Sequence, residues 1–114
     1  MDRVSSRRWV FTINNYTEED IQKLQSSLTL DNCYFAVVGK EIAPTTKTPH
    51  LQGYAALKQK QKTKRIKGIK KIVGATAQVE IAKGSDLQND HYCGKEEQVI
   101  LRVGTPGLAP PGKK

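Results

Sequence analysis

The amino-acid sequence predicts an α+β domain of ferredoxin-like, split βαβ topology, with helices packed on a central, largely antiparallel five-stranded sheet. Five short segments are apolar or alternate apolar with polar residues, as strands do, and three segments repeat apolar residues at helical spacing. Their order is β-α-β-β-α-β followed by α-β, a split βαβ unit with an added helix and strand. A fold of this class stacks its helices on one face of the sheet. The length of 114 residues suits one domain with a modest core.

The first strand and the first helix are predicted near the N-terminus. In Arg8–Asn14 every second residue is apolar, so the strand is expected to bury one face and to leave Thr12 and Asn14 on the other. Thr17 then stands where a helix N-cap is expected, with Asp20 at the capping-box position. Apolar residues at helical spacing follow, which predicts a helix of about three turns.

The rest of the chain supplies four strands and two helices. Cys33–Glu41 and His50–Leu57 are extended segments joined by a short connection, which predicts a β-hairpin. In Thr63–Val73 apolar residues recur at helical spacing with lysines between them, and Gly68 weakens this helix without abolishing it. The last elements are a strand at Ala77–Ala82, a helix capped by Ser85 or Asp86 that carries Tyr92, and a closing strand at Gln98–Val103.

Three residues of the hairpin form a candidate site for a divalent cation. His50 and Gln52 lie two residues apart in an extended segment, so both side chains project from the same face. Glu41 closes the preceding strand, and the short hairpin brings its carboxylate alongside. These ligands suit Mn²⁺ or Mg²⁺ and fill only part of an octahedron, which leaves positions for water and phosphate oxygens. On an arbitrary strand the same residues are most often surface side chains.

Tyr92 and Lys95 are the candidate catalytic residues. A phenol has a pKa near ~10, so it is a weak nucleophile at neutral pH unless its surroundings help. In the predicted helix, residues three apart are neighbours, so Lys95 would offset negative charge on a phenolate or a phosphorane. Asn89 shares this helix face, which is unusually polar for a packing surface. The alternative is an ordinary half-buried tyrosine with its hydroxyl at the rim.

The charge of the chain predicts a polyanionic partner. There are 19 Lys and Arg against 11 Asp and Glu, which gives a formal net charge of +8. The segment Lys58–Lys71 is rich in lysine and contains no acidic residue. Such a run is about equally often a solvated helix face. Beside a metal site and a tyrosine, phosphate contact is the better interpretation, and binding should then weaken steeply with salt.

Three motifs in order resemble those of the HUH-type replication initiator (Rep) endonucleases of small circular single-stranded DNA viruses, most of all those of circoviruses. The motifs are Phe11–Asn15 (FTINN), Thr48–Gly53 (TPHLQG) and Tyr92–Glu96 (YCGKE), and the segment Ala82–Asn89 is circovirus-like as well. The similarity extends over roughly Arg8–Gly104. Many members of this family carry a second histidine at the position of Gln52, and circovirus-like members carry glutamine there.

The resemblance implies an enzyme that nicks and joins single-stranded DNA. Tyr92 would attack a phosphodiester in the loop of an origin hairpin, become linked to the 5′ phosphate and free a 3′ hydroxyl for rolling-circle synthesis. It implies catalytic roles for Tyr92 and Lys95, a metal site of Glu41, His50 and Gln52, and action in a host nucleus. The residues expected to contact DNA are Thr12, Asn14, Asn15, Lys58, Lys60, Lys64 and Asn89.

The same resemblance predicts the domain boundaries. Residues 1–104 would form the endonuclease domain, and the Pro/Gly-rich residues 105–114 a linker to a helicase domain that normally follows in this family. Gly107–Lys113 imitates the spacing of a phosphate-binding loop, but Lys114 replaces the Ser or Thr that would hold magnesium.

Composition adds expectations about the cellular setting. Cys33 and Cys93 are too few and too far apart for a disulfide framework, so we expect reduced packing residues. The N-terminus does not resemble a signal peptide and no run is long enough to cross a bilayer, which predicts a soluble intracellular protein.

Two other interpretations stay open at this point. One is a non-catalytic single-stranded nucleic-acid-binding module of RRM-like fold, which would display aromatic residues on its sheet for base stacking. The strand with His50, Gln52 and Tyr54 lacks an aromatic pair, which favours the nuclease. The other is an inactive copy of the nuclease.

Overall fold

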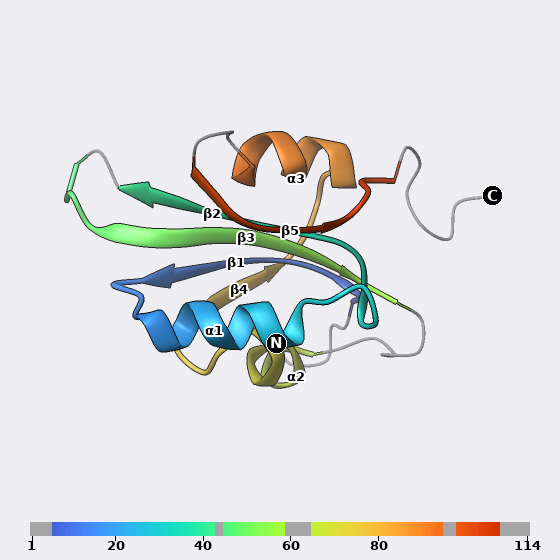
Figure 1. Cartoon of the computed structure of the whole chain (residues 1–114), viewed down its shortest axis with the longest axis horizontal. Helices are drawn as coiled ribbons and strands as arrows, with labels where there is room; N and C mark the ends of the chain where they lie inside the picture. The colour runs from blue at the N-terminus through green and yellow to red at the C-terminus, as the bar shows by residue number, and fades with distance from the viewer. Residues whose placement is uncertain (1–5, 43–44, 59–64, 95–97, 108–114) are drawn as a thin grey trace.

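A computed structural model describes residues 6–42, 45–58, 65–94 and 98–107, which form a sheet covered by helices on both faces (Figure 1). Each pair of neighbouring strands is antiparallel, in the order β4-β1-β3-β2-β5. This confirms the predicted α+β fold with a five-stranded antiparallel sheet. The elements are β1 (Arg8–Asn14), α1 (Glu18–Ser27), β2 (Cys33–Ile42), β3 (Pro49–Leu57), α2 (Ile66–Val73), β4 (Gln78–Ile81), α3 (Asp86–Cys93) and β5 (Val99–Gly104).

One face of the sheet carries α1 and α2 over the larger part of the core. The alternating apolar side chains of β1 point to this face, and Trp9, Phe11 and Ile13 are each about 1% exposed. Helix α1 begins with the predicted capping box, in which Thr17 and Asp20 satisfy each other's backbone N–H groups. Leu24 of α1 and Ile69 of α2 are fully buried against the strands.

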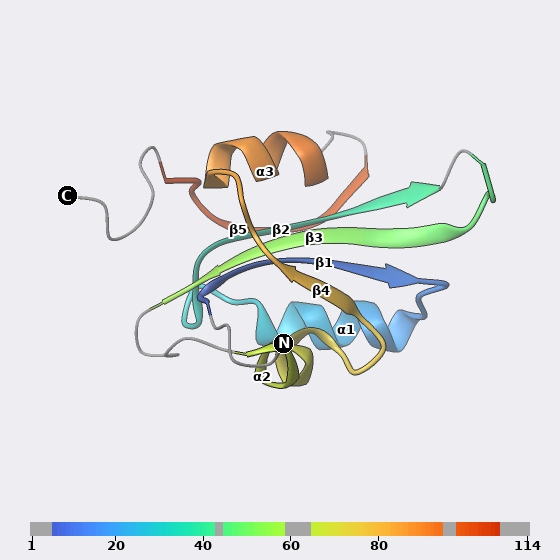
Figure 2. The same cartoon turned by 180° about the vertical axis from the view of Figure 1, so that it is seen from behind.

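The opposite face carries α3 over a smaller core of Phe35, Val37, Tyr54, Ala56, Ala82 and Cys93 (Figures 1 and 2). The expectation of helices on one face therefore holds for α1 and α2 and is wrong for α3. The topology supplies the reason. Strands β4 and β5 lie at opposite edges of the sheet, so the connection between them crosses the face that α1 and α2 leave open.

This arrangement separates α2 from α3. The lysines of α2, Lys67, Lys70 and Lys71, lie on the far side of the sheet from Tyr92. The interpretation of the basic segment as a neighbour of the tyrosine is therefore wrong for the part of the segment in α2. Lys58 does not belong to α2, because it directly follows β3. Lys60 and Lys64 lie outside the described residues.

The cysteines and the lengths of the helices bear on two further expectations. Cys33 and Cys93 are free and buried, as predicted for packing residues. Burial raises the pKa of the Cys33 thiol to about 11. No helix among the described residues is both long and apolar enough to span a membrane.

Candidate metal and tyrosine site

The strand register brings the three predicted metal ligands together. Glu41 of β2 pairs with His50 of β3, and Gln52 lies two residues further along the same face. Glu41 Oε1 and His50 Nε2 are 3.1 Å apart, and both side chains are partly exposed. The face they share is the one that α3 covers, because Leu51 between His50 and Gln52 points to the opposite core.

Thr12 of β1 orients the amide of Gln52. The two residues are directly paired across β1 and β3, and the Thr12 hydroxyl donates a hydrogen bond of 3.1 Å to Gln52 Oε1. An amide oxygen has a second lone pair, which stays available for another partner. The Thr12 side chain therefore has a contact inside the protein, where the sequence suggested a contact with DNA.

The donor set fits a divalent cation that accepts both oxygen and nitrogen. Carboxylate, imidazole and amide groups converge from two adjacent strands, and a site of three protein ligands leaves positions for water and phosphate oxygens. No group of three or more His, Cys, Asp or Glu side chains converges among the described residues. A cation site at this position would therefore need Gln52 as its third ligand.

Helix α3 ends beside these ligands. A Cβ atom at Gly39 of β2 would overlap the carbonyl oxygen of Cys93, so the last turn of α3 lies directly on the strand there. Gly39 pairs with Gln52 and precedes Glu41 by two residues. The Cys93 thiol has its pKa raised to about 12, first by burial and then by the negative charges of Glu41 and Asp90. Glu41 therefore acts electrostatically on the last turn of α3.

Tyr92 lies in this last turn and points away from the core. Its side chain is 58% exposed, in contrast to the buried Cys93 that follows it. This exposure suits a nucleophile, and it equally suits the alternative of a half-buried tyrosine with its hydroxyl at the rim. His91 is exposed as expected.

Arg102 of β5 fixes the same end of α3. Its guanidinium forms an ion pair with Asp90 and donates a 3.2 Å hydrogen bond to the carbonyl oxygen of Gly94, the C-cap of the helix. A cation at a helix C-terminus is also favoured by the helix dipole. The sequence did not suggest this role for Arg102.

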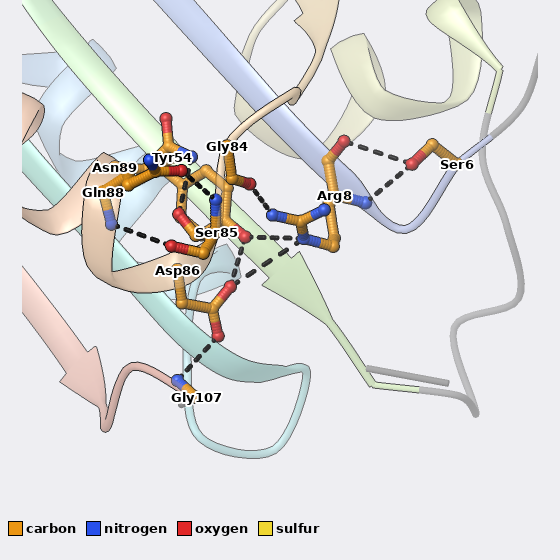
Figure 3. Close-up of polar contacts among 9 residues, drawn as sticks. All are labelled: Ser6, Arg8, Tyr54, Gly84, Ser85, Asp86, Gln88, Asn89 and Gly107. Atoms are coloured by element: carbon orange, nitrogen blue, oxygen red, sulfur yellow. Dashed lines mark hydrogen bonds and ion pairs between the residues drawn. The ribbon is translucent and has the colours of Figure 1, made fainter. Parts of the chain in front are cut away.

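A buried polar network holds the other end of α3 (Figure 3). The Tyr54 hydroxyl donates to Asp86, the first residue of the helix, and accepts a 2.9 Å hydrogen bond from Arg8 Nε. Arg8 also donates to the carbonyl oxygen of Gly84, and the Gly107 amide donates to the second Asp86 oxygen at 2.9 Å. Burial and the neighbouring Asp86 carboxylate raise the pKa of Tyr54 well above its ordinary value, so the phenol stays a donor.

Sequence reasoning missed this network. Tyr54 continues the alternation of His50 and Gln52, so its face was predictable, but nothing local paired it with Asp86 or Arg8. The predicted cap of α3 is confirmed, since Ser85 and Gln88 form a capping box.

The predicted DNA contacts are distributed over different parts of the molecule. Asn14 and Asn15 are exposed at the end of β1, where Asn14 pairs with His50. Lys58 follows β3 at the end opposite His50. Asn89 is only 9% exposed and its side-chain amide donates to the Ser85 carbonyl oxygen, so the expectation that it shares an exposed face with Tyr92 is wrong. The three-residue spacing predicted that Asn89 and Tyr92 share one face of α3. Instead, Asn89 lies with Asp86 and Cys93 on the buried side of this helix.

The predicted relation between Tyr92 and Lys95 also changes. Helix α3 ends at Cys93 with Gly94 as its C-cap, so the three-residue spacing no longer places these two side chains on one helix face. Lys95 lies outside the described residues.

The sequence of the chain matches known proteins over nearly its whole length. The profile of a family described as "Putative viral replication protein" matches residues 6–96. The chain belongs to this family. The replication-associated protein of pigeon circovirus is 44% identical over 102 residues, which cover 90% of this chain and 30% of that protein.

Further relatives agree with this assignment. The replication-associated protein of beak and feather disease virus is 47% identical over 98 residues, which are 86% of this chain and 32% of that protein. The Para-Rep C2 protein of milk vetch dwarf C2 alphasatellite is 44% identical over 103 residues, 90% of this chain and 35% of that protein. The resemblance inferred from the three motifs is confirmed. The chain spans about a third of the length of the curated relatives it matches.

Proposed function

We propose that this member of the viral replication protein family is a sequence-specific single-stranded DNA endonuclease that nicks and joins DNA at a replication origin. It would initiate rolling-circle replication through a covalent link between Tyr92 and the 5′ phosphate. The substrate would be the loop of an origin hairpin in the host nucleus, and a helicase domain would follow in the whole protein.

The observation that carries the proposal is the meeting of two elements on one face of the sheet. Strands β2 and β3 bring Glu41, His50 and Gln52 together, and the last turn of α3, with the exposed Tyr92, lies on Gly39 next to them. A nucleophile and an open cation site on the same face are the two parts that phosphodiester cleavage by tyrosine needs.

The proposed chemistry assigns one task to each group. The Tyr92 hydroxyl loses its proton and its oxygen forms a bond to phosphorus while the bond to the 3′ oxygen breaks, and that oxygen takes up a proton and leaves as a 3′ hydroxyl. Glu41, His50 and Gln52 would hold Mn²⁺ or Mg²⁺, which when bound polarises the phosphate and neutralises developing charge. Thr12 keeps the Gln52 amide in place. Because one phosphodiester replaces another, the reverse reaction joins DNA ends at the same site.

The layered fold argues against the RRM-like alternative. Such a module stacks bases on aromatic residues of an open sheet face. In the described part of this chain both faces of the sheet are covered by helices, and the sheet aromatics Phe35 and Tyr54 are fully buried. Base stacking on these two rings would require α3 to leave the sheet, whereas Tyr34 near the start of β2 is 47% exposed and is a single ring, in contrast to the aromatic pair of such a module.

A gel assay tests the proposal. The chain is incubated with a single-stranded origin oligonucleotide labelled at its 3′ end, with Mn²⁺ or with chelator, and compared with Tyr92→Phe. We expect a slower-migrating covalent product that requires both the metal and the tyrosine, because only the 5′-phosphate fragment stays attached. DNA binding without this product in any condition would favour the binding module or an inactive copy.

A further inference from the structure

A cavity of about 850 Å³ opens at the end of the sheet opposite His50. It lies where β1 begins, β3 ends and the segment after β5 passes. Lys58 on its wall follows His50 by eight residues along an extended strand, which corresponds to about 26 Å. The cavity is therefore separate from the metal and tyrosine site. Its lining includes Arg7, Leu30, Cys33, Tyr34, Leu57 and Lys58.

The walls of this cavity combine an apolar surface with an exposed aromatic ring. Cys33 and Leu57 are buried and form part of the floor, while Tyr34 is 47% and Leu30 59% exposed at the rim. Large apolar side chains exposed together at a concave site are typical of ligand-binding surfaces. The Nζ of Lys58 lies over the Tyr34 ring, 5.9 Å from its centroid, so one face of the ring is paired with a cation and the other is left for a ligand.

The charged groups of the cavity favour an anion. Its acidic member, Asp86, is already bonded to Tyr54 and Gly107, and the Arg8 guanidinium is occupied by Tyr54 and Gly84. Arg7 differs, because its Nε is buried and has no hydrogen-bond acceptor among the described residues. Arg7 and Lys58 thus remain to hold negative charge.

We infer that this cavity binds one nucleotide of a single DNA strand, with the base against Tyr34 and Leu30 and the phosphate against Arg7 and Lys58. An aromatic ring beside cations is the arrangement with which proteins hold single strands without reading every base. The inference rests on the proposed function only in naming DNA as the ligand, and it requires neither the metal nor Tyr92. A strand bound here and at Tyr92 would contact the protein at both ends of the sheet.

Binding measurements on the whole chain test this site without cleavage. A fluorescent oligothymidylate is titrated with the Tyr92→Phe variant in the presence of chelator. Adding Tyr34→Ala should weaken binding roughly five- to 100-fold, as expected for a lost stacking contact, and Tyr34→Phe should not. Arg7→Gln should weaken binding and lower the slope of log K against log salt by about 0.7. Lys23→Gln, an exposed single-charge control on α1, should change affinity much less.

Nuclear magnetic resonance places the ligand. Signals of Tyr34, Leu30 and Arg7 should shift with the oligonucleotide, and more than with inorganic phosphate alone. Oligonucleotide affinity that is unchanged by both Tyr34→Ala and Arg7→Gln would overturn the inference. So would contacts, in the free chain, between the Tyr34 ring and residues 108–114, because the cavity would then be filled by the chain itself. None of these results depends on whether Tyr92 cleaves DNA.

Discussion

His50 and Tyr54 project from the same strand to the same face of the sheet, yet their surroundings are opposite. Tyr54 is fully buried and its hydroxyl is bonded to Asp86 and Arg8. His50 is partly exposed and lies beside the Glu41 carboxylate. Helix α3 makes the difference. Its first residue, Asp86, contacts Tyr54, whereas its last turn lies on Gly39, which pairs with Gln52, so the helix ends short of His50.

Polar residues on this one face of the sheet have two different kinds of partner. At the closed end, containing Tyr54, Asp86 and Arg8, every partner is a protein group, so the network fixes the start of α3. At the open end, containing Glu41, His50 and Gln52, we propose that groups arriving from solution bind. In the proposed function, a helix fixed at its first turn would hold Tyr92 at a constant position relative to the open end.

The largest expected effect is a loss of nicking activity from a substitution at the open end. His50→Ala should reduce nicking by more than about 100-fold, since even outer-shell partners of metal ligands cost up to that factor. The free energy of unfolding should change by less than about 1 kcal/mol, because His50 is partly exposed and outside the core. Initial nicking rates and urea denaturation measure the two quantities. The matched control is His91→Ala on the exposed side of α3, and similar losses of activity in both variants would refute the distinction.

A second substitution tests whether the position of α3 matters. Gly39→Ala places a methyl group on the carbonyl oxygen of Cys93, so the last turn of α3 must move. Overpacking of this kind costs about 1–3 kcal/mol of stability. A displacement near 1 Å can lower the nicking rate on the order of 10²-fold. Single-turnover cleavage at saturating DNA measures this loss, and a normal rate in a merely less stable variant would show that Tyr92 is positioned by something else.

At the closed end we expect a substitution to lower the stability of the protein and to leave its activity largely unchanged. Tyr54→Phe removes a hydroxyl from the buried Asp86 carboxylate, which keeps Arg8 and Gly107 as partners. The unfolding free energy should fall by about 1–3 kcal/mol. Urea denaturation of this variant is compared with that of Tyr34→Phe, an exposed tyrosine whose change should stay within about 0.5 kcal/mol. Equal, small changes in both would mean that the network contributes little.

The smallest effect concerns alkaline pH and the burial of Cys33 in the core beneath α1 and α2. Burial raises the pKa of Cys33 from 9.0 to about 11, while the Lys58 charge and a hydrogen bond from the Thr29 backbone oppose the shift. The unfolded state therefore loses this proton first, and the contribution of Cys33 to stability is complete below pH 9 and is lost as the pH rises toward 11. Cys33→Ala should show a shallower decline of stability over this range. Parallel curves for the two proteins would indicate a hydrated thiol.

Local patterns account for the parts of this molecule that were predictable. Alternation identified the buried face of β1, and the two-residue spacing of His50 and Gln52 placed them on one face. Thr17 and Ser85 were recognisable as caps because a capping box is complete within four residues.

The parts that could not be predicted depend on distant residues. Arg8, Tyr54 and Asp86 are separated by 46 and 32 positions along the chain, and each alone is an ordinary polar residue. The placement of α3 on the second face follows from where β4 and β5 join the sheet, which periodicity does not reveal. The same fact explains Asn89, whose burial depends on the side of α3 that meets the sheet.

The most direct test of the central claim is a titration of the chain with Mn²⁺ followed by nuclear magnetic resonance, since the ion broadens the signals of nearby atoms. We predict that signals of Glu41, His50, Gln52 and Tyr92 disappear first, that those of Tyr54 and Asp86 persist to higher concentrations, and that His50→Ala removes the effect. Broadening centred elsewhere on the chain, or an unaffected Tyr92 beside broadened ligands, would contradict the account.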